Sequence, residues 1–300
     1  MSEFRGPDLV LAGAARSGTT RLAARLAQHP SIVSPSIKEP NYFSSRLDRG
    51  YDWYAGLYPR TDGLWLDASA QYTFPSYLDA LDRAAELAPN LRVVYLVRDP
   101  IPRAYSHYCQ EVLYLGKHGG ATFGSALHLS GDFAGASDYE LILARLQQVV
   151  PAERLLVLPF EFIVADLGTA TDVALRFADV DPAKSDSSAQ TDDLYANQAA
   201  IIGNPVVRRT FNAVRGTRLY PRLRRLVGAE RMRSARSRLT SSDSIPPLAD
   251  ALTTCTPADL EMLSDLTARS SAAVSNYLAA QDARLGLDLL SSCKWITGSS

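Results

Sequence analysis

Cysteine is scarce in this chain of 300 residues, and the three that occur lie far apart. Cys109, Cys255 and Cys293 match neither a disulfide framework nor the ligand spacing of a zinc site. Long apolar runs are missing as well, because no stretch approaches the roughly 18 residues of a membrane span. The chain opens with polar residues that lead into a strand, which is not the pattern of a signal peptide. We therefore expect a soluble, cytoplasmic protein.

The chain also lacks an excess of charge of either sign. Its 31 Lys and Arg residues stand against 32 Asp and Glu, a formal net charge of −1, so we expect no nucleic-acid partner. Residues 205–240 are the local exception, with eleven arginines against one acidic residue, a charge of +10. Two interpretations stay open: a solvated helical face, or a basic lid over an anionic ligand that also contacts a membrane surface.

Apolar segments alternate between the patterns of strands and helices. Hydrophobic residues make up 46% of the chain, which is enough to bury a large core. Strands are predicted at 9–12, 63–67, 91–97 and 154–160, and helices at 18–28, from 75, from 100, at 137–149, at 161–177 and around 260–277. This order predicts an α/β fold, a P-loop-like parallel sheet flanked by helices. We expect one domain over residues 1–300, with a core at about 8–180 and a helical, arginine-rich C-terminal part at about 185–290.

One glycine-bracketed turn organises the chain. The segment from Gly13 to Thr20 follows an apolar strand, opens a helix and has the spacing G-x-x-x-x-G-x-T. Such a turn can hold a phosphate, because the first amides of the helix point at the anion. Thr19 stands where a nucleoside triphosphatase has lysine, and the cation is Arg16 instead. The pattern indicates an anion held without a metal; the alternative is a turn that binds nothing.

Two further segments join this loop in a family resemblance. They are Lys38–Phe43 and the strand end Leu96–Pro100 with the helix residues Arg103–Tyr108. Together the three resemble sulfotransferases that use 3′-phosphoadenosine 5′-phosphosulfate (PAPS), in the branch of the heparan sulfate sulfotransferases and their bacterial relatives. The resemblance implies transfer of a sulfuryl group from PAPS to a hydroxyl or amine of a glycan, lipid or small molecule. PAPS, its product PAP and the acceptor are the implied partners.

The resemblance also implies two anion sites. The first holds the 5′-phosphosulfate, and the second, at Arg98 and Ser106, holds the 3′-phosphate. The arginine-rich stretch, at Arg208 and Arg209, is expected to replace a cofactor-closing loop that this chain lacks. The residues implied for the first site are Arg16, Ser17, Gly18, Thr19 and Thr20.

The implied chemistry needs a base and a cation. Glu39 occupies the position of the base in the resembling branch, and Lys38 or Arg16 would stabilise charge on the transferring group. His107 is a second candidate for the base, although a structural role is favoured. One departure is that Ala68, or a neighbour, stands where the branch often has lysine.

Two other classes of function stay open. A P-loop kinase or other nucleotide phosphotransferase would need the loop lysine and an acidic Mg²⁺ ligand at a strand end. A non-catalytic module could instead bind anions or a membrane through residues 205–240.

Overall fold

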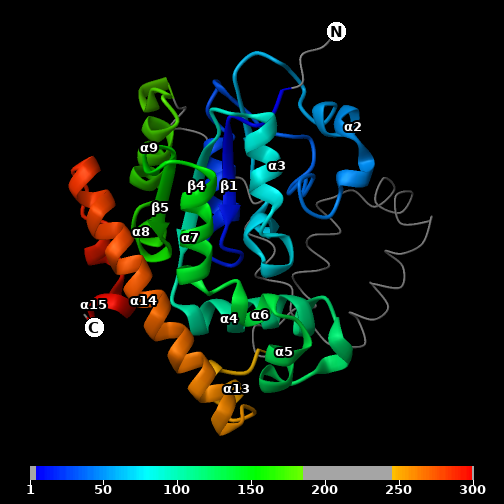
Figure 1. Ribbon diagram of the computed structural model, residues 1–300, viewed down its shortest axis with the longest axis vertical. Helices are drawn as coiled ribbons and strands as arrows, with labels where there is room; N and C mark the ends of the chain where they lie inside the picture. The colour runs from blue at the N-terminus through cyan, green and yellow to red at the C-terminus, as the bar shows by residue number, and fades with distance from the viewer. Residues whose placement is uncertain (1–4, 185–244, 299–300) are drawn as a thin grey trace, which may run out of the picture. The chain divides into compact units, whose positions relative to one another are not determined.

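The computed structural model describes residues 5–184 and 245–298 (Figure 1). These residues divide into two compact units. The first comprises the described residues up to 104, those of 131–184 and those of 261–298, and the second comprises 105–130 and 245–260. Residues 205–240, and with them Arg208 and Arg209, lie outside the described residues.

The first unit contains a five-stranded parallel sheet. The strand order is β2-β3-β1-β4-β5, and β1 pairs through Leu9 with Leu66 of β3 and with Arg92 of β4. Nearly continuous apolar strands are typical of a sheet covered on both faces. The predicted α/β fold with a parallel sheet is confirmed. The strands are β1 (Leu9–Gly13), β2 (Ile32–Val33), β3 (Leu64–Asp67), β4 (Arg92–Val97) and β5 (Leu155–Pro159).

The direction in which the chain moves across the sheet places the helices. From β1 the chain moves through α1 to the β2 side, whereas α3 and α7 lead to β4 and β5 on the other side. Right-handed crossovers therefore put α1 on one face and α3 and α7 together on the opposite face. Figure 1 shows α3 and α7 beside each other in front of the strands. The strand order reverses between β1 and β4, and ligands of open α/β sheets bind outside the carboxyl ends at such a point. The helices of this unit up to β5 are α1 (Thr19–Leu26), α2 (Tyr51–Ala55), α3 (Ala80–Leu87), α6 (Asp132–Gly135) and α7 (Tyr139–Val149), and α4 (Pro100–Tyr108) begins in it.

The helical segment predicted after the last strand is interrupted. It forms α8 (Phe160–Ala165) and α9 (Leu167–Phe177), with Asp166 between them. The backbone of Asp166 is extended, and its Oδ1 accepts a hydrogen bond from the Thr169 amide at 3.0 Å. An aspartate that caps a helix start in this way ends the preceding helix, because its own backbone is not helical.

The long helix α14 (Pro257–Leu285) covers the open edge of the sheet. The Gln281 side chain accepts from the Val157 amide and donates to the Val157 carbonyl, both at 2.8 Å. The Tyr277 hydroxyl donates to the Leu155 carbonyl at 3.1 Å. An amide side chain thus takes the place of a sixth strand and satisfies edge groups that would otherwise pair with another chain. The short helix α15 (Lys294–Thr297) follows.

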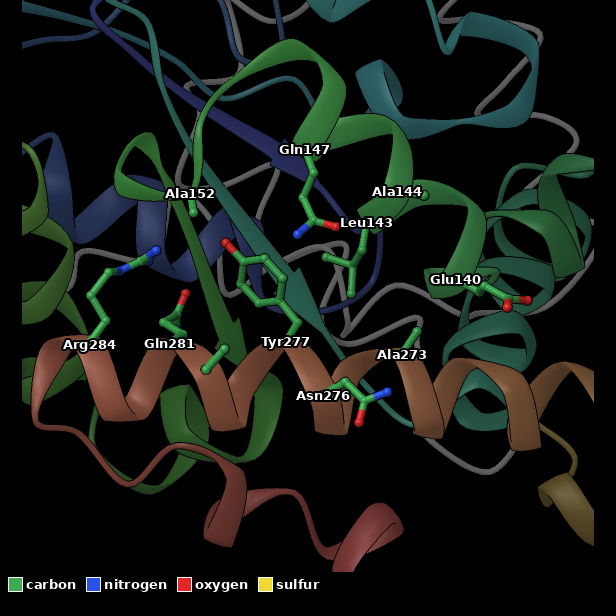
Figure 2. Close-up of a pocket in the computed structure, with 11 residues that line it drawn as sticks. Glu140, Leu143, Ala144, Gln147, Ala152, Ala273, Asn276, Tyr277, Gln281 and Arg284 are labelled. Atoms are coloured by element: carbon green, nitrogen blue, oxygen red, sulfur yellow. The ribbon is translucent and has the colours of Figure 1, made fainter.

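A cavity of about 310 Å³ lies between α7 and α14. Figure 2 shows Tyr277 and Gln281 rising from α14 toward the strands, with Gln147 reaching in from α7. The lining runs along α7 from Glu140 to Gln147 and also includes Ala152, just before β5.

The second unit is helical in its described part. It contains the end of α4, a π-helix (Cys109–Tyr114), α5 (Phe123–Leu129), α13 (Leu248–Leu252) and the first residues of α14. Sequence reasoning assigned no structure to Gly116–Gly135, which holds α5 and α6. The Gly124 amide donates to Thr254 Oγ1 at 3.0 Å, and a Cβ at Gly124 would overlap the Thr254 carbonyl. None of the helices in the described ranges has both the length and the apolar character of a membrane span.

Candidate active site

The loop between β1 and α1 forms a compact cradle. Gly13 has a φ of 141° and Gly18 a φ of 92°, values that only glycine adopts at low cost. A Cβ at Gly13 would overlap the Thr73 Oγ1, which donates to the Ala12 carbonyl at 2.9 Å. Arg16 also has a positive φ of 72°, and such strain in a non-glycine residue is typical of functional loops.

The start of α1 leaves donors for an anion. The first intrahelical bonds run from the Arg21 and Leu22 amides to the Gly18 carbonyl at 3.0 and 3.2 Å. The amides before Arg21 therefore precede the helical ladder, as at any helix start. The Ser17 side chain is fully buried and interacts with the Tyr139 hydroxyl. The anion-binding character of this place therefore comes from the backbone amides at the helix start.

Arg98 is joined directly to this loop. It follows β4, and its Nη1 donates to the Arg16 carbonyl at 2.9 Å. The Tyr139 hydroxyl donates to the Arg98 carbonyl at 2.7 Å and accepts from its amide at 3.1 Å. The guanidinium lies 4.4 Å from the centre of the Phe160 ring. Burial lowers the pKa of Arg98, so this cation is held in a partly desolvated place where it attracts an anion strongly.

A second arginine also donates a hydrogen bond to the backbone of the loop. Arg103, on α4, is fully buried, and its Nη1 donates to the Ala15 carbonyl at 3.2 Å. Its other nitrogens donate to Ser137 Oγ and to the Phe133 carbonyl. Sequence reasoning quoted Arg103 within a motif but gave it no role. The sequence did offer a signal for such a role: Arg103 stands between Pro102 and Ala104 at the start of a helix whose other side chains suit a core.

Lys38 and Glu39 lie in the loop that follows β2. Their side chains form an ion pair of 3.4 Å between Nζ and Oε1, and each is about one third exposed, at 31% and 36%. Glu39 and Asn41 have positive φ values of 53° and 52°. The Arg46 Nη1 donates to the carbonyls of Glu39 and Pro40 at 3.2 and 2.8 Å. A charged side chain on a strained, pinned backbone is the arrangement expected of a functional loop.

A buried carboxylate lies near this loop. Asp67 ends β3 and is fully buried, and burial raises its pKa from 3.8 to about 6 despite three hydrogen bonds that oppose the rise. The negative charge of Glu39 adds to the rise in pKa. Ala68, where the resembling branch often has lysine, follows directly. Sequence reasoning gave Asp67 no role, although a carboxylate at the carboxyl end of a sheet strand is a signal for one.

The first unit thus brings together most of the expected site. The loop from Arg16 to Thr20 and Arg98 meet at the ends of β1 and β4, and Glu39 lies near the end of the neighbouring strand β3. Ser106 and His107 lie on α4 within the second unit, so their roles stay predictions. Within the described residues, no cluster of three or more His, Cys, Asp or Glu side chains could hold a metal ion.

Comparisons with known proteins find similarity to sulfotransferases. The model of the sulfotransferase family matches residues 41–184. This match covers slightly less than half of the chain, and over that segment the chain is similar to sulfotransferases. Over 112 residues it is 36% identical to heparan sulfate glucosamine 3-O-sulfotransferase 6 of Mus musculus, and over 115 residues 36% identical to the bifunctional heparan sulfate N-deacetylase/N-sulfotransferase 3 of the same species. These matches cover 36% and 35% of this chain.

The likeness to those relatives is limited to a segment. The chain spans 31% and 13% of their respective lengths. Among solved structures, a sulfotransferase from Alicyclobacillus acidocaldarius superposes with a TM-score of 0.54 at 22% identity. The superposition covers 69% of this chain and 90% of that protein, so the two proteins share a fold.

Proposed function

We propose that this protein is a sulfotransferase, which transfers a sulfuryl group from PAPS to a hydroxyl or amine of an acceptor. The observation that carries the proposal is the hydrogen bond from Arg98 to the Arg16 carbonyl, which joins a second cation to the glycine-loop cradle. PAPS needs two anion sites, one for its 5′-phosphosulfate and one for its 3′-phosphate. The cradle and the desolvated Arg98 supply two adjacent places for such groups.

Each residue has a role in this proposal. The amides of the loop and the side chains of Arg16, Ser17, Thr19 and Thr20 bind the phosphosulfate, with Gly18 keeping the backbone close. The resemblance implies Arg98 and Ser106 for the 3′-phosphate, and Arg208 and Arg209 stay predictions from the sequence as further cofactor-binding residues. When bound, PAPS supplies the sulfuryl group and a phosphate leaving group.

The transfer itself depends on positioning and charge, as in phosphoryl transfer. Glu39 accepts the proton of the attacking hydroxyl, and Lys38 or Arg16 balances charge that develops on the leaving phosphate. The ion pair of Lys38 and Glu39 supports this assignment, because it keeps a cation and a carboxylate beside each other on one loop.

Location and membrane contact are further predictions. We propose that the protein is cytoplasmic and that residues 205–240 make a peripheral contact with anionic surfaces. Salt-dependent retention on anionic vesicles, compared between the chain with all eleven arginines and one with them replaced by glutamine, tests the contact.

The function is tested with radiolabelled PAPS offered together with glycan, lipid and aromatic alcohols and amines. We expect transfer of label to one acceptor class in the presence of a metal chelator. Transfer of the γ-phosphate of ATP under Mg²⁺ instead would favour the kinase alternative. Binding of PAPS with no transfer to any class would favour a non-catalytic module.

A further inference from the structure

Hydrogen bonds connect a buried carboxylate to the loop that carries Glu39. Asp67 Oδ1 accepts from the Ser69 hydroxyl at 2.6 Å, and Oδ2 accepts from the hydroxyls of Tyr72 and Tyr54 at 2.8 and 3.1 Å. All four side chains are buried, so these hydroxyls have little access to water. The carboxylate therefore determines where each hydroxyl directs its proton.

Two of these hydroxyls also hold the backbone of the loop. The Asn41 amide donates to Ser69 Oγ at 3.0 Å, and the Phe43 amide donates to the Tyr72 hydroxyl at 3.4 Å. A hydroxyl has a single proton, so one that donates to Asp67 presents its lone pairs to the amide. The charge of Asp67 thereby fixes the direction of both contacts to the loop.

The loop needs such support because its backbone is strained. Glu39 and Asn41, on either side of Pro40, both have positive φ values. The amide of Asn41 is two residues from the carboxylate of Glu39, so a shift there changes where Glu39 lies. The segment that contains Tyr72 also contacts the strand that leads into the glycine loop, because the next residue, Thr73, donates to the Ala12 carbonyl.

We propose that Asp67 is a positioning residue, which through Ser69 and Tyr72 sets the backbone at Asn41 and Phe43 and so the place of Glu39 relative to the glycine loop. This role rests on the proposed function, in which Glu39 accepts the proton of the acceptor. A carboxylate suits the task because it accepts all three hydrogen bonds, whereas an asparagine amide accepts on its oxygen alone.

Hydrogen exchange tests the proposal without reference to activity. Tyr72→Phe removes the hydroxyl that joins Asp67 to the Phe43 amide, and we expect exchange of the amides in 41–43 to quicken at least tenfold. Tyr58→Phe is the matched control: Tyr58 is a buried tyrosine of the same cluster, bonded to the Tyr54 hydroxyl at 3.0 Å and to the Leu66 carbonyl at 3.4 Å. It should leave exchange at 41–43 unchanged. Equal exchange at 41–43 in the wild type and Tyr72→Phe overturns the proposal.

Kinetics give the second readout. In Asp67→Asn and Tyr72→Phe we expect kcat to fall about 10- to 100-fold, with PAP affinity within twofold of the wild type, and Tyr58→Phe to keep its kcat. A fall in PAP affinity with unchanged kcat, or an equal loss of kcat in Tyr58→Phe, contradicts a positioning role. If the wild type transfers no sulfuryl group, the proposed function fails, and the exchange result alone then decides whether Asp67 sets the loop.

Discussion

At the scale of single residues, the clearest prediction concerns Arg98. Its guanidinium is partly desolvated and lies beside the glycine loop, so Arg98→Ala should weaken PAP binding by about 1.5–3 kcal/mol, the value of lost charged hydrogen bonds. Calorimetry measures the loss. Arg92→Ala is the control. Arg92 begins the strand that Arg98 follows, so it lies at the opposite end of that strand, and it pairs with Asp179. Equal losses in both variants would remove the case for a phosphate site at Arg98.

The assignment of the base is tested at Glu39. Glu39→Gln keeps the size of the side chain and removes its basicity, so turnover should fall by about 10²–10⁴ while PAP binds normally. Steady-state kinetics and calorimetry on the same preparation give both values. His107→Asn supplies the comparison. If that variant binds PAP but is inactive, while Glu39→Gln turns over normally, the base is His107.

The buried Asp67 makes stability depend on pH. Its pKa is about 6 in the folded protein against a usual 3.8, so the folded state holds the proton more tightly than the unfolded chain does. Ionisation of Asp67 therefore costs stability above pH 6, and that cost is relieved as the pH falls from 7 toward 4. Relative to Asp67→Asn, the wild type should gain stability by up to about 1.4 kcal/mol per pH unit between pH 6 and 4. Denaturant unfolding of both proteins at pH 7 and 5 checks the sign, and a constant difference between them would contradict it.

At the scale of elements, α14 closes the edge of the sheet. Gln281→Leu leaves the buried amide and carbonyl of Val157 without partners, at a cost of about 1–3 kcal/mol each. We expect a loss of about 2–5 kcal/mol in the free energy of unfolding, measured by denaturant titration. Asn276→Ala, an exposed change on the same helix, should stay within about 0.5 kcal/mol. Similar losses in both variants would mean that the edge contacts contribute little.

At the scale of the whole molecule, binding should be visible as stabilisation. PAP at about 100 times its dissociation constant stabilises the folded state by about 2.7 kcal/mol, which corresponds to a rise in Tm of about 5–10 °C. AMP at the same concentration lacks the 3′-phosphate and should raise Tm far less. Thermal unfolding with a chelator present makes the comparison. Equal rises with AMP and PAP would contradict a separate site for the 3′-phosphate.

Local chemistry made much of this protein predictable from its sequence. The glycine spacing from Gly13 to Gly18, the apolar run of β4 and the cap at Asp99 depend on neighbours within a few residues, and each predicted the element that formed. The alternation of such segments was sufficient for the parallel sheet, because crossovers are right-handed. The loop residues and Arg98 could be chosen as site candidates for the same reason: parallel strands end at one edge.

Other features depend on residues that are distant in the sequence. The contact of Arg103 with Ala15 joins positions 88 residues apart, and that of Gln281 with Val157 joins positions 124 apart. The network of Asp67, Tyr72 and Phe43 likewise forms only when the loop after β2 folds against the end of β3. A polar side chain has the same local pattern whether it meets water or a buried partner. The sequence therefore determined the sheet and the glycine loop, whereas only the tertiary structure decided which buried polar groups hold the loops of the site, because those partners meet only in the folded core.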